Sequence, residues 1–211
     1  MKIIVTAGPT REYLDPVRFL SNPSTGKMGF ALAAEAAHRG HRVMLIAGPV
    51  ALKTPKGVKR VDVVSAREML AAVRAALPAQ VLISTAAVAD WRPARCAASK
   101  LKKGEMASIL KLVRNPDILK SVKGLRKVGF AAETDHVLAE AARKCREKNL
   151  EFIVANDVTE HGSGFGTATN RVTLVWPNGV RKAYPLQTKR CVARHILNEI
   201  EKQTIRKDKA K

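Results

Sequence analysis

Residues 5–29 of the chain read VTAGPTREYLDPVRFLSNPSTGKMG. An apolar run typical of a strand ends at Gly8-Pro9, a polar loop follows, and a second loop containing Gly26 opens a helical stretch at Lys27. A helix start preceded by small residues exposes unpaired N–H groups and the positive end of the helix dipole, which favour a phosphate group. This order of segments predicts a strand, a turn and a helix that bind a phosphorylated ligand at one edge of a sheet.

Two familiar phosphate-binding motifs are absent from this stretch. No G-x-G-x-x-G pattern follows Val5, so the dinucleotide fingerprint is missing. Lys27 is followed by Met28 instead of Ser or Thr, and no glycine lies five positions before Gly26, which excludes a Walker-type loop. The alternative is that these glycines serve only as turn residues.

Apolar, β-branched runs alternate with helical stretches along most of the chain. We expect strands at residues 3–6, 43–47, 61–64, 81–85, 128–131, 152–155 and 172–176, and helices at 27–39, 66–77, 117–124, 135–148 and 189–202. Ser65 and Glu68 have the spacing of a capping box, and Gly40 follows a helix at the position that favours left-handed backbone. The alternation predicts an α/β fold with a doubly wound, mainly parallel, Rossmann-like sheet.

The C-terminal third departs from this alternation. A glycine-rich segment, residues 161–167, separates two apolar runs where a helix would be expected, and Pro177-Asn178-Gly179 favours a tight turn into a further strand. We therefore expect a small β appendage at about residues 156–185, used in pairing with a second subunit. The domain prediction is one domain over residues 1–203, followed by a basic, disordered tail at 204–211.

Composition limits the class of protein. With 211 residues, 46% of them hydrophobic, the chain can bury one sizeable core. No apolar run approaches the roughly 20 residues that a membrane helix needs, so we expect a soluble, cytoplasmic protein without membrane contact. Cys96, Cys145 and Cys191 form no C-x-x-C pair, which predicts reduced cysteines without a metal or redox role.

The net charge of +20, from 38 Lys and Arg against 18 Asp and Glu, leaves two interpretations open. It could indicate affinity for polyanions, or simply a solvated basic surface. Only 4% of the residues are aromatic, and neither zinc-finger spacing nor an aromatic and basic RNA-binding motif is present. A dedicated nucleic-acid reader is therefore not expected.

Polar residues follow several of the expected strands. Asp90 comes after the strand at 81–85, where small residues would let a ligand approach the backbone, although it could equally be a loop or cap residue. Lys100 to Lys103 could be a solvated basic turn, and Asn115-Pro116-Asp117 is a good helix start with or without a ligand. Lys144 and Lys148 lie one helical turn apart and could face one polyphosphate or solvent.

Seven groups of residues together resemble one family. They are TAGPTRE at 6–12, DPVRFLSN-x-STGKMG at 15–29, AAVADWRP at 86–93, KLKK at 100–103, LVRNPDIL at 112–119, GFAAET at 129–134, and ANDV with GFGTATNRV between 155 and 172. In order and spacing they closely resemble phosphopantothenoylcysteine synthetase. Because the chain begins directly at the first synthetase strand, we expect a stand-alone bacterial synthetase instead of one fused behind a flavin-dependent decarboxylase.

The resemblance implies a ligase of coenzyme A synthesis that joins 4′-phosphopantothenate to L-cysteine. Such enzymes use CTP in most bacteria and ATP in eukaryotes, with Mg²⁺, and pass through an acyl-nucleotidylate that cysteine attacks. The KLKK, NPDIL and paired-lysine segments resemble the CTP-using group. A homodimer is implied, and a separate phosphopantothenoylcysteine decarboxylase is an open partner.

The resemblance also implies roles for individual residues. The catalytic set is Asn22, Lys100 and Arg18, with Arg18 reaching the acid from the neighbouring subunit. Nucleotide contacts are implied for Gly8, Ser24, Gly26, Gly29, Asp90, Lys100, Pro116, Asp117, Ile118, Leu119, Phe130, Lys144 and Lys148, and phosphopantothenate contacts for Asn22, Ala86, Ala87, Asp90 and Arg18. The metal ligands stay open. Pro23, Trp91 and Leu101 depart from the usual family residues without changing a charged role.

Two other classes remain as alternatives. One is a nucleotide-sugar or NAD-type reductase on a similar sheet, which the missing fingerprint disfavours. The other is a polyanion-binding module, which the charge of +20 would explain.

Overall fold

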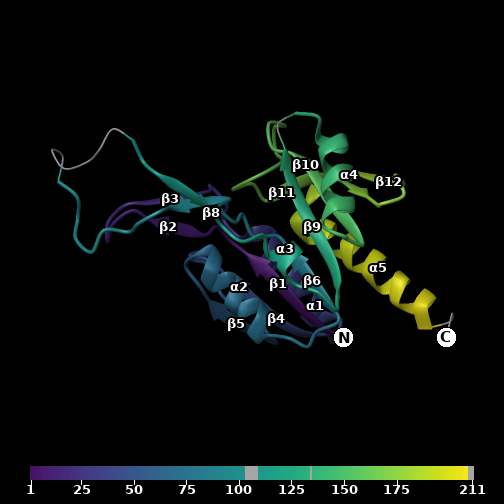
Figure 1. The fold of residues 1–211 in the computed structure, drawn as a ribbon. Helices are drawn as coiled ribbons and strands as arrows, with labels where there is room; N and C mark the ends of the chain where they lie inside the picture. Colours follow the sequence, from purple (N-terminus) through teal and green to yellow (C-terminus); the bar gives the residue numbers. More distant parts are fainter. Residues whose placement is uncertain (103–108, 134, 209–211) are drawn as a thin grey trace.

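The computed structural model describes residues 1–102, 109–133 and 135–208 of the chain. A sheet of eight strands runs through its centre in the order β12-β11-β10-β9-β6-β1-β4-β5 (Figure 1). The strands are β1 Lys2–Ala7, β4 Arg42–Ala47, β5 Val58–Asp62, β6 Val81–Ser84, β9 Arg126–Glu133, β10 Phe152–Asp157, β11 Thr169–Val175 and β12 Arg181–Thr188.

The sheet is doubly wound, as the alternation predicted. Strands β5, β4, β1, β6, β9 and β10 are parallel, whereas β11 and β12 add an antiparallel edge. The chain moves outward from β1 to β4 and β5, then returns to the other side of β1 with β6. Strands β1 and β6 therefore flank the point where the strand order reverses, and ligands of such sheets bind outside the carboxyl ends of the strands at that point.

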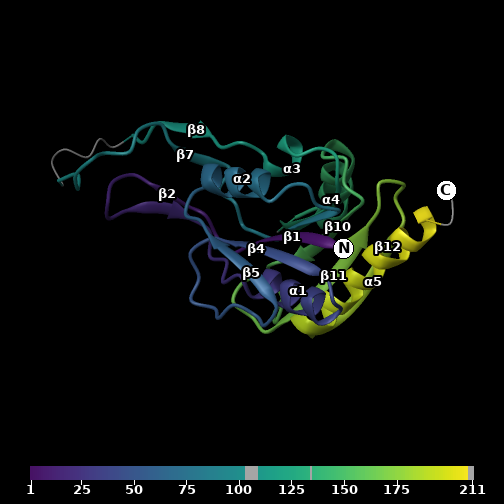
Figure 2. The ribbon, with the colours of Figure 1, turned by 90° about the horizontal axis from the view of Figure 1, so that it is seen from below.

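Helices cover both faces of the sheet (Figure 2). Helices α1 (Lys27–His38) and α5 (Lys189–Asp208) lie on one face, and α2 (Ala66–Ala75), α3 (Ile118–Ser121) and α4 (Val137–Glu147) lie on the other. The sheet thus has two core clusters, the first against α1 and α5 and the second against α2, α3 and α4. Side chains alternate along β1 accordingly: Ile3 and Val5 belong to the first core cluster and Ile4 to the second. Both faces are buried, which explains the continuous apolar runs of these strands.

Two local signals appear as expected. The Ser65 side chain accepts a hydrogen bond from the Glu68 N–H at 3.2 Å, and the Glu68 carboxylate accepts from the Val64 N–H and the Ser65 hydroxyl at 2.9 Å each, so α2 starts at a variant of the capping box that bonds the N–H before the cap. Gly40 has φ 78° after α1, where its N–H reaches the Ala37 carbonyl.

Some boundaries differ from the sequence-based ones. Helix α3 ends at Ser121 instead of 124, because Val122 already has extended backbone with φ −113° and ψ 130°. The expected appendage at 156–185 is a continuation of the main sheet, since β11 pairs with β10 in antiparallel register. Helix α5 extends through residues 204–208, which were expected in the disordered tail. Residues 202–208 contain no Gly or Pro to end the helix.

Two short hairpins were not expected at all. Strands β2 (Arg11–Tyr13) and β3 (Phe19–Ser21) form one, and β7 (Trp91–Pro93) and β8 (Leu112–Arg114) form the other. They project from one side of the sheet, on the left in Figure 1, and we refer to the described residues of 11–21 and 91–114 as the arm. None of the helices in the described part of the chain is both long and apolar enough to cross a membrane.

Candidate functional site

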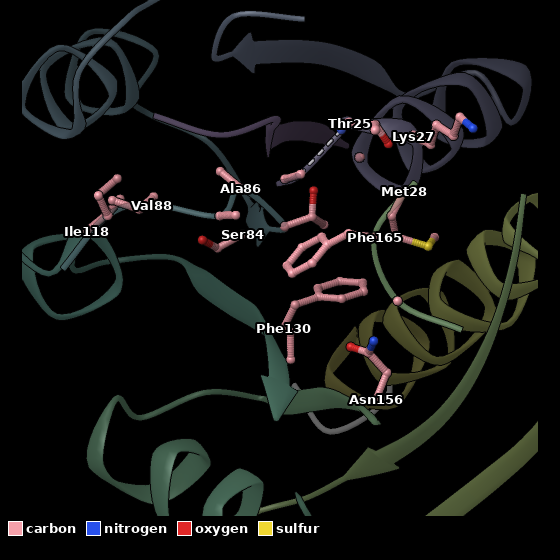
Figure 3. A pocket seen from close by; sticks show the side chains of 18 of the residues that line it. Thr25, Lys27, Met28, Ser84, Ala86, Val88, Ile118, Phe130, Asn156 and Phe165 are labelled. Atoms are coloured by element: carbon pink, nitrogen blue, oxygen red, sulfur yellow. Dashed lines mark hydrogen bonds between the residues drawn. The ribbon is translucent and has the colours of Figure 1, made fainter. Parts of the chain in front are cut away.

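A pocket of about 300 Å³ opens at the carboxyl ends of β1 and β6. The connections that leave the sheet edge enclose it: residues 24–29, 84–90, 115–119 and 164–166, together with Phe130, Ala132, Lys148, Asn156, Asn170 and Lys189. Figure 3 shows the rings of Phe130 and Phe165 directed into this cavity. The pocket therefore lies at the reversal point of the strand order, where this class of sheet binds ligands.

Glycines form the end of the pocket at helix α1. Gly26, the residue before the helix, has left-handed backbone with φ 77° and provides no side-chain cap. A Cβ on Gly29 would lie 2.5 Å from both the Ala7 Cβ and the Thr85 Oγ1, so only glycine lets α1 approach β1 this closely. The N–H groups of the first helical turn have no acceptor within an α-helix, and this turn lines the pocket. These are the features of an anion-binding helix start.

Gly8 and Asn22 connect this end to the neighbouring loop. A Cβ on Gly26 would be 3.4 Å from the Gly8 Cα, and the Gly8 carbonyl accepts from the Ala87 N–H at 2.9 Å. The Asn22 side-chain amide donates to the Ala87 carbonyl at 3.1 Å. Neither Gly8 nor Asn22 lines the pocket, but both are bonded to a residue that does.

The opposite end combines carboxylates with apolar side chains. The Asp117 carboxylate caps α3 by accepting from the Lys120 N–H at 3.0 Å, and it pairs with the Lys148 ammonium at 2.9 Å. Burial alone would raise the pKa of Asp117, but the hydrogen bonds and charges of Lys148 and Lys120 lower it below its ordinary value. Ile118, Leu119 and Phe130 provide an apolar wall beside this ion pair.

The glycine-rich loop forms the remaining wall. The Lys189 ammonium, on a side chain only 7% exposed, donates to the carbonyls of Gly164 at 2.9 Å and Thr167 at 2.7 Å. Burial, aided by the charge of Lys27, lowers the pKa of Lys189 to about 8. The Asn170 side chain accepts from the Ser163 hydroxyl and the Gly164 N–H. This loop is therefore fixed by buried polar side chains.

Most of the residues expected in the site surround the pocket. Ser24, Gly26, Gly29, Ala86, Ala87, Asp90, Pro116, Asp117, Ile118, Leu119, Phe130 and Lys148 all line it. Lys144 does not line the pocket and pairs instead with Glu133 at 2.5 Å. Sequence reasoning assigned no role to Lys27, Asn156, Phe165, Asn170 or Lys189. GFGTATNRV was noted as a motif, but no local pattern marks Lys189.

Arg18 and Lys100 lie on the arm instead of in the pocket wall. The Arg18 guanidinium pairs with the buried Asp15 carboxylate, with Nε to Oδ2 at 2.9 Å, and donates to the Leu101 carbonyl at 2.9 Å. Lys100 is exposed next to Leu101. Residues 103–108, including the last lysine of KLKK, lie outside the described residues.

The pocket has few carboxylates for a resident metal. Within the residues that the structure describes, no group of three or more His, Cys, Asp or Glu side chains is arranged to hold a metal ion. Asp90 and Asp117 are the carboxylates of the pocket lining, and Asp117 is paired with Lys148. This set fits a metal that arrives bound to a polyphosphate, because Mg²⁺ commonly uses one or two carboxylates plus substrate phosphates.

Comparisons with known proteins agree on one family. Residues 1–204 match the family model described as DNA/pantothenate metabolism flavoprotein C-terminal domain. The coenzyme A biosynthesis bifunctional protein CoaBC of Escherichia coli K12 is 49% identical over 95% of this chain, and that of Bacillus subtilis 168 is 47% identical over 94%. The match covers 51% and 50% of those two proteins, so the chain spans about half the length of these curated relatives.

Solved structures agree with the fold. The crystal structure of the C-terminal domain of a CoaBC protein superimposes with a TM-score of 0.82 at 42% identity, covering 96% of this chain and 95% of that one. The DNA/pantothenate metabolism flavoprotein from Streptococcus pneumoniae superimposes with a TM-score of 0.80 at 25% identity, covering 96% of this chain and 99% of that one. The chain therefore belongs to the family of DNA/pantothenate metabolism flavoprotein C-terminal domains.

Proposed function

We propose that this chain is a phosphopantothenate–cysteine ligase of coenzyme A synthesis that uses CTP. The observation that carries the proposal is the pocket at the reversal point of the sheet, where a glycine-lined helix start faces a loop, residues 86–90, suited to a second substrate. The similarity to CoaBC proteins over nearly the whole chain supports the same activity.

The reaction needs an activated acid, because a carboxylate repels an attacking amine and has no good leaving group. The phosphopantothenate carboxylate attacks the α-phosphate of CTP, which forms an acyl-cytidylate and releases pyrophosphate. The amine of cysteine then attacks the acyl carbon and releases CMP. Both steps build negative charge that N–H groups and cations held in place can stabilise.

The pocket suggests where each substrate part binds. The triphosphate lies against the start of α1, with Gly8, Ser24, Gly26 and Gly29 leaving room for it. The base and ribose lie against Pro116 to Leu119 and Phe130, with Lys144 and Lys148 behind them and Asp90 between the two substrates. Phosphopantothenate lies along Ala86 and Ala87, where Asn22 holds the acyl carbonyl. Mg²⁺ would supply charge neutralisation on the triphosphate, and the carboxylate of Asp90, for which no ion pair is found within the described part of the chain, suits it.

We further propose a homodimer in which Arg18, on the arm, reaches phosphopantothenate in the pocket of the neighbouring subunit. Lys100, also on the arm, contacts the α-phosphate during transfer. Exposed apolar side chains on the arm support an interface there: Val17 is 55% exposed and Trp91 is 45% exposed. The continuous sheet and the family match over residues 1–204 support a single domain over 1–203. A cytoplasmic location is part of the same proposal. A separate decarboxylase remains an open partner.

Release of pyrophosphate in the presence of phosphopantothenate, cysteine and a nucleoside triphosphate tests this function. We expect release that requires phosphopantothenate, with CTP preferred over ATP by roughly 10–200-fold, as is typical of small-pocket discrimination. Equal or faster turnover with ATP would contradict the choice of CTP. Release without phosphopantothenate, or none at all, would favour the reductase or polyanion-binding alternatives.

A further inference from the structure

Phe165 is an exposed aromatic residue in a largely polar loop. Its side chain is 40% exposed and belongs to neither core cluster. Figure 3 shows its ring directed into the cavity on the same side as Phe130. An exposed ring that faces a ligand pocket leaves apolar surface in water until something covers it.

The loop fixes the position of the Phe165 ring, and this requires a buried charge. Gly164 and Gly166, with φ 90° and 77°, flank Phe165 and set its direction. The Lys189 ammonium binds the Gly164 carbonyl, and the Lys27 ammonium binds the Gly166 carbonyl at 2.6 Å. Burying the Lys189 charge beside a second lysine is unfavourable, as its lowered pKa reflects. The two lysines therefore fix the loop, and with it the Phe165 ring, on both sides.

The chemistry around the ring points to a planar ligand group. Phe130 contributes a second ring, and the side chain of Asn156, with both amide donors and an acceptor carbonyl, lines the same part of the pocket. Aromatic rings that line a pocket with one amide suit a nucleobase, because every base has a stacking face and polar edges.

We propose that Phe165 stacks on the base of the bound nucleotide and that Lys189 is the positioning residue that keeps it there. The inference rests on the proposed function for the identity of the nucleotide. In this proposal the base lies between the rings of Phe165 and Phe130, while the triphosphate lies along the start of α1, where Lys27 holds the other end of the same loop through the Gly166 carbonyl. The ring thus raises the affinity for the nucleoside part of the ligand and leaves the affinity for polyphosphate unchanged.

Calorimetric titration with CTP and with inorganic tripolyphosphate tests the role of the ring. Phe165→Ala should weaken CTP binding by about fivefold to a hundredfold, the range for loss of a base-stacking contact, while tripolyphosphate affinity stays unchanged. Phe165→Tyr should keep wild-type affinity, and Phe165→Leu should fall between. Val180→Ala, which shortens an exposed side chain in the β11–β12 turn, is the control. Unchanged CTP binding, or equal loss for both ligands, would overturn the proposal.

A double-mutant cycle tests the positioning role of Lys189. Lys189→Met should reduce CTP affinity alone, and adding Phe165→Ala should cause little further loss, because both changes remove the same contact. Lys189→Arg should restore part of the affinity. Additive losses would show that Lys189 acts elsewhere. If Lys189→Met does not fold, the same cycle is run with Lys189→Arg, and the Phe165 series decides the stacking role.

The outcomes separate this inference from the proposed function. If the wild type turns over and Phe165→Ala binds CTP as tightly as the wild type, only this inference is overturned. CTP binding that depends on Phe165, without any ligation, would overturn the function alone. If Phe165→Ala changes the oligomeric state and leaves CTP binding unchanged, the ring belongs to a protein interface and the inference is overturned.

Discussion

At the scale of single residues, Asp15 organises the base of the arm. Its buried carboxylate accepts from the N–H groups of Val17 and Arg18 at 2.9 Å each and from the Leu101 N–H at 3.3 Å, and it pairs with the Arg18 side chain. The Arg18 guanidinium, followed by these backbone N–H groups, holds the pKa of Asp15 well below its usual range despite burial.

We predict that Asp15 makes stability depend on acid pH. Because its folded pKa lies below the unfolded value of 3.8, its contribution is fully present above that value and is lost as the pH falls through and below it. The difference in free energy of unfolding between wild type and Asp15→Asn should be constant from pH 5 to 7, and shrink below about pH 4. Urea unfolding across this range measures it. A difference that does not change with pH would show that the carboxylate charge is not involved.

Lys100 carries the second prediction at this scale. If it contacts the α-phosphate during transfer, Lys100→Gln should slow pyrophosphate release by about 10²–10³, as for loss of one charge-stabilising contact. The melting temperature should not change, because the side chain is exposed. Lys123→Gln, which removes another exposed lysine away from the pocket lining, is the matched control. Near-normal release by folded Lys100→Gln would mean that KLKK is only a solvated turn.

At the scale of elements, the glycine-rich loop is the feature that closes the pocket. Gly164 has φ 90°, and a Cβ there would meet the Val158 Cα at 3.2 Å. Gly179 in the β11–β12 turn has φ 85°, with no atom within 4 Å of such a Cβ. An alanine at either position would have to adopt left-handed backbone. Only at Gly164 would its Cβ also meet neighbouring atoms at close range.

This difference gives a matched pair of variants. Gly179→Ala should lose about 1–2 kcal/mol of stability through its backbone conformation alone and keep CTP affinity. Gly164→Ala should lose more stability and also weaken CTP binding, because the Cβ displaces the loop that carries Phe165. Thermal unfolding and calorimetry measure both effects. Equal behaviour of the two variants would mean that the loop accommodates the extra carbon without moving.

At the scale of the whole molecule, the arm and the pocket are separate parts of one chain. Arg18 is bonded within the arm, whereas Asn22, only four positions later, is bonded to Ala87 at the pocket. In the homodimer that we propose, Arg18 contributes to the pocket of the neighbouring subunit. The exposed apolar side chains of the arm would then be covered by the second copy.

Mixed dimers test the shared site. Arg18→Ala removes the charge contact to phosphopantothenate, and Asn22→Asp replaces an amide donor with a carboxylate, so each homodimer should be nearly inactive. A mixed dimer has one site with both lesions and one with neither, and pyrophosphate release should reappear when subunits exchange. No recovery despite demonstrated mixed dimers would place both residues in the same subunit's site.

Several parts of the fold followed from local sequence patterns. The continuous apolar runs predicted the parallel strands, and Ser65 with Glu68 predicted the start of α2, because a capping box is formed within one helical turn. The hairpins β2–β3 and β7–β8 were missed, since their strands of three residues have no resolvable alternation. They are held by contacts between distant segments, such as the Ala97 N–H on the Leu14 carbonyl.

The residues of the site likewise fall into those that the sequence predicted and those that only the tertiary structure revealed. Gly26 and Gly29 were predicted from the sequence, because an anion-binding helix start needs small residues close together in the chain, and both line the pocket. Lys189 was not recognisable, because its ammonium reaches the carbonyl of Gly164 across β11 and β12. The local sequence thus predicted the glycines at one end of the pocket. The antiparallel edge of the sheet returns the chain to the pocket, and this tertiary arrangement decided which side chains fix the glycine-rich wall. Pairing between strands depends on contacts that no short stretch of sequence contains.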